Sequence, residues 1–346
     1  MTALGRIALT REYACDPEGG SFPADATLGI DGYLTGQARR MATLAGVGQP
    51  FAKAERVLDE PCGWRLDDET IRLVTHAAAR RAAAERPQRA DAARFAATPG
   101  DIEVPIDAGK VNAPEGWRDV KIAPFCRREA GDPALPAEWD DRELPPPTIR
   151  TAIAAIEDSE AFAARVRAEA DRLDATAAAT VSVLGDGAEW IWNLAEEVFP
   201  QADGVLDVYH ALEHVGDAVR AVWGDGTDAA TAHREAGREA LIAGGKAGFE
   251  RWLATAFAAV PAGVSTDPLI AAAAYLAKHP TRLNYAERLA AGRSIGSGAV
   301  EGAVKQLINL RMKRTGARWR VENVGPFVEL IALSETPDWN ALWAAA

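Results

Sequence analysis

The sequence has few cysteines and no long apolar run. Its three cysteines, Cys15, Cys62 and Cys126, lie far apart and are odd in number, so they predict no disulfide framework. Because thiols persist in reducing compartments, we expect an intracellular location. No apolar stretch reaches the length of a membrane span, and the first residues lack the apolar core of a signal peptide. The sequence therefore predicts neither a disulfide-rich scaffold nor a membrane-spanning protein.

Positive charge is scarce over most of the chain. The 38 Lys and Arg stand against 50 Asp and Glu, a formal net charge of −12 that argues against a surface covered on all sides by nucleic acid. Between Arg293 and Arg320, however, seven Lys and Arg oppose the single acid Glu301, so this segment carries +6 and the rest of the chain −18. This concentration of cations predicts either contact with a polyanion such as a phosphate backbone or a solvated basic helix face.

Two short apolar segments each end in an aspartate. In residues 102–107 the apolar residues alternate strictly, which predicts a half-buried strand with Asp107 on its polar face. Residues 181–187 read VSVLGDG, a second short strand that ends at Asp186 between two glycines. Ligands of open α/β sheets bind outside the carboxyl ends of strands, and the glycines would let a metal or phosphate approach the backbone. A turn aspartate without a ligand is the alternative for Asp186.

A long motif near the carboxyl end gives the most specific signal. Residues 296–319 read GSGAVEGAVKQLINLRMKRTGARW, with apolar residues three or four apart as on one face of a helix. This stretch resembles the last catalytic motif of bacterial DDE transposases of the ISKra-type insertion-sequence group, which are related to ISL-type and Mutator-like transposases. Residues 107–125, DAGKVNAPEGWRDVKIAPF, resemble the first motif of that family. The pair Asp207 and His210 resembles its Asp-x-x-His signature.

The resemblance implies a catalytic site of three carboxylates. Asp107, Asp186 and Glu301 would bind two divalent cations, Mg²⁺ or Mn²⁺, because hard cations take oxygen ligands. One ion would activate the attacking oxygen and the other would stabilise the leaving 3′-oxygen. Asp207 and His210 would be auxiliary residues beside the metals or the DNA end. The implied activity is that of a transposase: DNA cleavage at the ends of an insertion sequence, followed by strand transfer.

Double-stranded DNA is the partner that the resemblance implies, at the terminal inverted repeats and at the target. The cations that follow the third carboxylate are expected to contact phosphates: Lys305, Arg311, Lys313, Arg314 and Arg318. Arg311, Arg314 and Arg318 fall three or four residues apart and would form one stripe on a continuing helix. We also expect a homo-oligomer in the prokaryotic cytoplasm, associated with the nucleoid and not with a membrane.

The expected fold class is α/β. An RNase H-like catalytic domain, a mixed sheet with flanking helices, is expected from residues 99–223 and 293–346, with an all-helical insertion at 224–292. Within the first part, residues 148–156 could hold a third strand, and residues 159–174 are predicted to form a helix.

The amino-terminal region is predicted to be helical. Residues 31–98 contain two helices around a short turn, the second with Asp67 as its N-cap, which fits either a DNA-binding helix-turn-helix or a generic helical hairpin. Residues 1–30 resemble the remnant of a zinc ribbon that keeps Cys15 but has no second cysteine beside it. Because a structural zinc site takes about four ligands, no zinc is predicted.

Two alternatives to an active transposase stay open. His210, Glu213 and His214 match the H-x-x-E-H pattern of inverzincin metallopeptidases. That pattern belongs inside a longer helix, whereas a strand-like run at 205–208 ends just before it. The second alternative is a catalytically inactive, DNA-binding remnant of a transposase, since the zinc ribbon is degenerate although all three acidic positions are intact.

Overall fold

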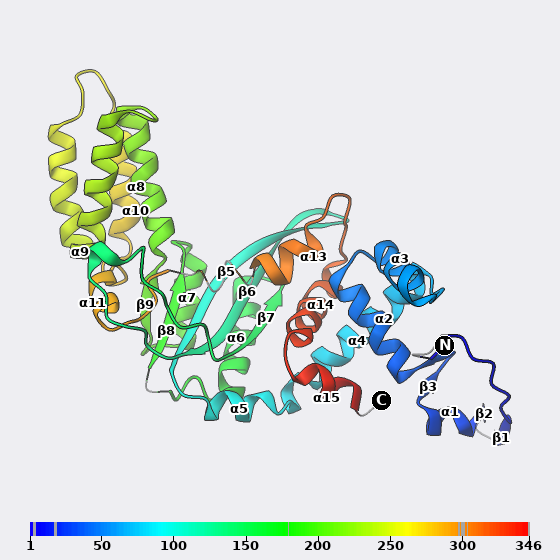
Figure 1. Ribbon diagram of the computed structural model, residues 1–346. Coiled ribbons are helices and arrows are strands. Elements are labelled where there is room, and N and C mark those ends of the chain that lie inside the picture. The colour runs from blue at the N-terminus through cyan, green and yellow to red at the C-terminus, as the bar shows by residue number, and fades with distance from the viewer. Residues whose placement is uncertain are drawn as a thin grey trace.

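The computed structural model of the chain describes residues 1–2, 5–16, 19–178, 180–296, 298, 302 and 304–344. A central sheet carries helices on both faces, a bundle of helices projects beyond one end of the sheet, and the amino-terminal helices pack beside the last long helix (Figure 1). The predicted α/β class with a mixed sheet and flanking helices is confirmed. Nowhere in these ranges is a helix long and apolar enough to cross a membrane.

The central sheet has five strands in the order β7-β6-β5-β8-β9. β6 is antiparallel to both of its neighbours, whereas β5, β8 and β9 run parallel to one another. The predicted third strand is present as β7. The bounds of the strands are β5 (Asp101–Ala113), β6 (Gly116–Arg128), β7 (Ile149–Ala155), β8 (Val181–Gly185) and β9 (Asp203–Leu206).

The alternation of residues along β5 directs side chains into two hydrophobic cores. Ile102, Val104 and Ile106 are fully buried in the core that also contains residues of α6 (Ser159–Arg172) and α7 (Glu189–Val198). On the opposite face, Val111 of β5 packs in a second core with residues of α14 (Val321–Ser334). Successive side chains of a strand point to opposite faces, so Asp107 shares the second face with Val111.

The chain between β9 and α14 is mainly helical. It contains α8 (Val208–Trp223), α9 (Asp228–Ala258), α10 (Asp267–Ala277) and α11 (Tyr285–Ala290), and α8 to α10 form the projecting bundle (Figure 1). α9 is interrupted at Gly245, where φ is 50° and a Cβ would lie 2.5 Å from the carbonyl oxygen of Leu283. Only a residue without a side chain fits this bend.

The strand expected at residues 205–208 lies two residues earlier in the chain than the sequence suggested, which is a correction. β9 ends at Leu206, and Asp207 is the N-cap of α8, with its carboxylate accepting a hydrogen bond from the His210 backbone N–H at 3.0 Å. The apolar residues after Asp207 therefore belong to a helix, because a side-chain cap satisfies the N–H groups at a helix start.

Small strands and helices make up the amino-terminal region. The predicted N-cap at Asp67 is confirmed, since its carboxylate accepts a hydrogen bond from the Thr70 N–H at 2.9 Å. α4 packs against both α2 and α14. The elements are β1 (Ala14–Asp16), β2 (Gly19–Ser21), α1 (Pro23–Leu28), β3 (Ile30–Asp31), β4 (Leu34–Thr35), α2 (Gly36–Gly48), α3 (Phe51–Cys62), α4 (Asp68–Glu85), η1 (Arg86–Gln88) and α5 (Asp91–Ala97).

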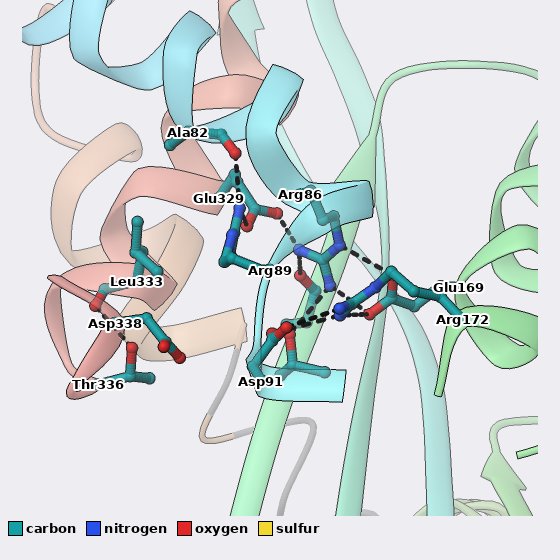
Figure 2. Close-up of polar contacts among 12 residues, drawn as sticks. Ala82, Arg86, Arg89, Asp91, Glu169, Arg172, Glu329, Leu333, Thr336 and Asp338 are labelled. Carbon is teal, nitrogen blue, oxygen red and sulfur yellow. Dashed lines mark hydrogen bonds and ion pairs between the residues drawn. The ribbon is translucent and has the colours of Figure 1, made fainter. Parts of the chain in front are cut away.

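A buried ionic network ties the amino-terminal helices to the sheet and to α14 (Figure 2). Arg86 of η1 hydrogen-bonds Glu169 of α6 at 2.7 Å and also pairs with Glu329 of α14. Arg89 reaches Glu329 at 2.6 Å, and Arg172 pairs with Glu169 at 2.7 Å. Burial raises the pKa of Glu169, but hydrogen bonds from Arg172 and Arg86 outweigh it and leave the pKa below its ordinary value. Three segments far apart in the sequence thus share one set of charges.

The basic segment does not continue as one helix, contrary to expectation. A π-helical turn, η3 (Val304–Asn309), leads into α13 (Leu310–Met312), and the chain then runs as a loop to the start of α14. Buried Val304, Leu307 and Ile308 hold η3 against the sheet. The remaining short elements are η2 (Pro136–Glu138) and α15 (Asp338–Ala344).

Candidate metal site at the carboxyl edge of the sheet

Strand register brings three aspartates to one edge of the sheet. Ile106 of β5 lies opposite Gly185 of β8, and Gly185 lies opposite Leu206 of β9. The residues that follow these three are Asp107, Asp186 and Asp207. Parallel neighbours are about 4.8 Å apart, so Asp107 and Asp186, 79 positions apart in the sequence, lie side by side where β8 ends, although β5 continues to Ala113. Asp207 is level with them, directly after the third parallel strand.

Local hydrogen bonds orient the carboxylates of Asp107 and Asp186. The Oδ1 atom of Asp107 accepts a hydrogen bond from the N–H of Ala108 at 2.7 Å. The Oδ1 atom of Asp186 accepts one from the N–H of Ala188 at 2.8 Å, just before α7, and the indole of Trp192 in α7 donates to the carbonyl oxygen of Asp186 at 2.8 Å. Both aspartates are only partly buried, so solvent reaches this edge.

The glycines beside Asp186 have a different role from the one predicted. A Cβ on Gly185 would lie 2.8 Å from Ile191, and a Cβ on Gly187 would lie 2.3 Å from the ring of Tyr275. The space above these glycines is therefore filled by side chains of α7 and α10. They permit close packing rather than the approach of a ligand to the backbone.

Asp207 and His210 are joined through the backbone of α8. Asp207 is fully buried, and its N–H donates to the carbonyl oxygen of Gly185 at 2.8 Å, which ties the start of α8 to β8. The imidazole Nδ1 of His210 lies 3.7 Å from Glu213, and its side chain is 40% exposed. His210 thus contacts the Asp207 carboxylate with its main chain, while its ring faces Glu213.

The third predicted carboxylate, Glu301, lies outside the described residues. The helix that follows it packs on the face of β5 that carries Asp107: a Cβ on Gly109 would lie 3.1 Å from Ile308 and 3.3 Å from Val304. Within the described ranges no group of three His, Cys, Asp or Glu is close enough to hold a metal ion. The two aspartates supply hard oxygen ligands of the kind that Mg²⁺ and Mn²⁺ take, usually with water and phosphate oxygens completing the coordination.

Four of the five predicted DNA-contacting cations lie at the surface. Lys305 is exposed on η3, and Lys313, Arg314 and Arg318 are exposed in the loop after α13. Arg320 is exposed at the end of the same loop. The segment thus presents a cluster of cations rather than a stripe along a helix.

Arg311 is the exception, and it corrects the prediction that it contacts DNA. It is only 6% exposed, and its guanidinium lies over the rings of Phe51, Trp319 and Phe327 at 4.7, 5.1 and 5.1 Å. Its Nε donates to the carbonyl oxygen of Gly46 at 3.1 Å. Burial, with Arg314 nearby, lowers the pKa of Arg311 to about 10. This arginine joins α13 to the amino-terminal helices, so it is not presented to a phosphate backbone.

Tyr275 lies beside Asp186, although it is not among the residues that the sequence predicts for the site. It extends from α10, and its ring stacks on His214 of α8 with centroids 3.7 Å apart. Burial, together with the negative charge of Asp186, raises the pKa of Tyr275 to about 12. No local pattern marks this tyrosine, because it reaches Asp186 only through the packing of α10 on α8.

The His210, Glu213 and His214 pattern lies in the first two turns of α8. His210 faces Glu213, whereas His214 stacks on Tyr275. The two imidazoles therefore have different partners, and the described chain gives them no third ligand group. A comparison of the chain with protein families and with curated proteins found no match to either.

Proposed function

We propose that this protein is a DDE transposase that cleaves DNA at the ends of an insertion sequence and transfers the strand by two-metal-ion phosphoryl transfer. The observation that carries the proposal is the register of the adjacent parallel strands β5 and β8, which sets Asp107 and Asp186 side by side where the pairing of these strands ends. Ligands of open α/β sheets bind at such an edge. The strand order, with β6 alone reversed, is the arrangement expected of an RNase H-like domain.

Asp107, Asp186 and Glu301 would hold the metal ions, which supply a nucleophile at neutral pH and stabilise the leaving oxygen. The chain's own contribution is to orient the two aspartates through the N–H groups of Ala108 and Ala188. Lys305, Lys313, Arg314 and Arg318 would neutralise phosphates of the bound duplex. Arg311 is left out of this set because it is buried.

The helix-turn-helix reading of α3 and α4 stays a prediction. A recognition helix contacts bases through its amino-terminal residues, and α4 carries Asp67, Asp68 and Glu69 there. These acids would face phosphates if that end entered a groove, which favours a helical hairpin that supports α14. The predicted homo-oligomer and nucleoid location are parts of the same proposal.

The test uses a linear DNA that carries the sequences flanking the gene on both sides. We expect cleavage with Mg²⁺ or Mn²⁺ that is insensitive to zinc-selective chelation. Asp186→Asn and Glu301→Gln should each reduce cleavage by more than ~100-fold, since even residues that only orient metal ligands cost 10–100-fold. DNA affinity should be kept or improved, because an acid beside phosphate is removed.

A matched control is Asp217→Asn, which changes an aspartate on α8 that pairs with Arg220 away from the strand ends. It should cleave like the wild type. Full activity of Asp186→Asn would exclude the proposed site. Binding without cleavage by the wild type would identify an inactive remnant, and peptidase activity lost in Glu213→Gln would support the metallopeptidase.

A further inference from the structure

Part of the β5–β6 hairpin projects beyond the sheet. β5 pairs with β8 only as far as Ile106, and the pairing of β6 with β7 ends at Lys121. Beyond these points residues 109–113 and 116–120 pair with each other as a two-stranded ribbon, here called the β5–β6 ribbon. It projects past the carboxyl edge that carries Asp107, on the same side of the sheet as the bundle of α8 to α10 (Figure 1).

The two faces of the β5–β6 ribbon differ. Val111 and Val120 are buried on one face, which η3 covers at Gly109. On the other face, at the tip, Trp117 is 59% exposed opposite Asn112. A single exposed aromatic is common on protein surfaces, so Trp117 by itself marks no site.

The loop after α13 is tied to the tip of the ribbon. The Trp319 N–H donates to the carbonyl oxygen of Asn112 at 2.8 Å, which holds residues 313–320 beside the tip. Residues 110–119 and 313–320 together contain six Lys and Arg and two acids in a chain of net charge −12. The four loop cations and Arg118 are all exposed. An exposed indole thus lies on a hairpin tip that is held beside a basic loop.

We propose that the tip of the β5–β6 ribbon and the loop 313–320 form a second contact with duplex DNA, separate from the metal site. Trp117 packs against bases or sugars in a groove, and Arg118 and the loop cations bind the flanking phosphates. A two-stranded ribbon fits the major groove, where apolar side chains contact base edges such as the thymine methyl group. This inference rests on the proposed function, because it takes DNA as the substrate.

The length of the ribbon fits this arrangement. Asp107 and Asn112 are five residues apart on β5, which corresponds to about 17 Å of extended strand. That is about half of the ~34 Å helical turn of DNA. A phosphate at the aspartates and a groove at the ribbon tip can therefore belong to one duplex, about five base pairs apart.

The experiment measures the affinity of the full chain for a fluorescein-labelled, mixed-sequence duplex of about four helical turns, over a range of salt concentrations. Trp117→Ala should weaken binding about tenfold with an unchanged salt slope, since an apolar groove contact carries no charge. Trp117→Phe should restore most of the affinity. Arg118→Ala should reduce the slope by about one. Arg167→Ala, on α6 and paired with Glu197, is the matched control and should change neither quantity.

Photo-crosslinking to the same duplex with 5-iodouracil in place of thymine should yield a crosslinked peptide that contains Trp117. Thermal unfolding of Trp117→Ala should match the wild type, and if that variant fails to fold, Trp117→Phe and the crosslink decide the case. If Trp117→Ala binds DNA with wild-type affinity, or if the crosslink is confined to other residues, the ribbon contact is overturned. The proposed function still holds in that case if the wild type cleaves DNA in a metal-dependent way. A wild-type protein that neither binds nor cleaves duplex DNA overturns both.

Discussion

Arg311 places a charge inside the protein, beneath three aromatic rings. Cation–π contacts with desolvated rings contribute about 2 kcal/mol or more. The Arg311 side chain also joins α13 to the amino-terminal helices through Phe51 and the carbonyl oxygen of Gly46. At the residue scale, arginines of the same basic segment therefore have two different roles. Exposed cations such as Arg314 are available to phosphates, whereas Arg311 stabilises the fold.

We predict that Arg311→Ala lowers stability without changing DNA binding, and that Arg314→Ala changes DNA binding without lowering stability. Arg311→Ala should lower the free energy of unfolding by about 2–4 kcal/mol, because it removes contacts with three rings and leaves a cavity. Its salt slope of DNA binding should match the wild type. Arg314→Ala should leave stability within ~0.5 kcal/mol and reduce the slope by about one. Urea denaturation measures the stability, and salt titrations of DNA binding measure the slope. If Arg311→Ala reduced the slope as much as Arg314→Ala does, Arg311 would not be buried as described.

His76 gives a pH dependence of stability with a defined sign. Burial among aromatic side chains, with Arg72 and Arg80 nearby, lowers its pKa from 6.5 to about 4. The unfolded chain takes up a proton near pH 6.5 while the folded chain does not, so stability falls as the pH drops from about 6.5 towards 4.

We expect His76→Phe to flatten this part of the profile. The change should amount to at most about 3 kcal/mol, since each pKa unit corresponds to 1.36 kcal/mol. The measurement is the free energy of unfolding of wild type and variant at several pH values. If the two profiles run parallel between pH 4 and about 6.5, His76 is not the residue that titrates.

At the scale of single elements, α9 depends on one glycine. Gly245 has φ of 50°, and a Cβ would lie 2.5 Å from the carbonyl oxygen of Leu283. The neighbouring Gly244 is closest to Arg251, a flexible side chain, at 3.1 Å. Position 245 therefore requires glycine, whereas position 244 can accept a side chain, although the sequence alone does not distinguish the two glycines.

We predict that Gly245→Ala lowers the free energy of unfolding by roughly 2–4 kcal/mol, because it combines backbone strain with a steric clash. Gly244→Ala is the matched control and should be neutral or stabilising, since alanine favours a helix. Thermal unfolding of the two variants checks this. Equal melting temperatures would mean that α9 bends without needing Gly245.

At the scale of the whole molecule, buried charges join regions that the sequence keeps apart. Glu329 of α14 forms ion pairs with both Arg86 and Arg89, and Glu169 forms ion pairs with Arg86 and Arg172 (Figure 2). α2, α4, the sheet and α14 also share a hydrophobic core. We therefore expect the amino-terminal helices and the sheet to unfold together.

We predict that Glu329→Gln lowers the free energy of unfolding by about 3–5 kcal/mol, because Arg89 loses its carboxylate partner and Arg86 keeps only Glu169. Unfolding followed in the amino-terminal helices and in the sheet should remain one transition at a lower denaturant concentration. Glu335→Gln changes an exposed acid one residue beyond α14 and should cost less than ~0.5 kcal/mol. Two separate transitions in Glu329→Gln would show that the regions are independent.

The sequence by itself determined local elements and named the two aspartates, although β5 continues past Asp107 to Ala113. Alternation in residues 102–107 predicted β5 and the position of Asp107, and capping chemistry predicted the start of α4 at Asp67, because these signals arise between residues a few positions apart. The pairing that aligns Asp107 with Asp186 was not readable in this way, although both were named as candidates.

Only the tertiary structure decided how distant side chains meet. The burial of Arg311 depends on Phe51 and Phe327, which come from either end of the chain, and the place of Tyr275 beside Asp186 depends on how α10 packs on α8. Periodicity reports which face of a helix is apolar but not which neighbour covers it. An arginine in a basic stretch and a tyrosine in an alanine-rich helix therefore received their roles from packing.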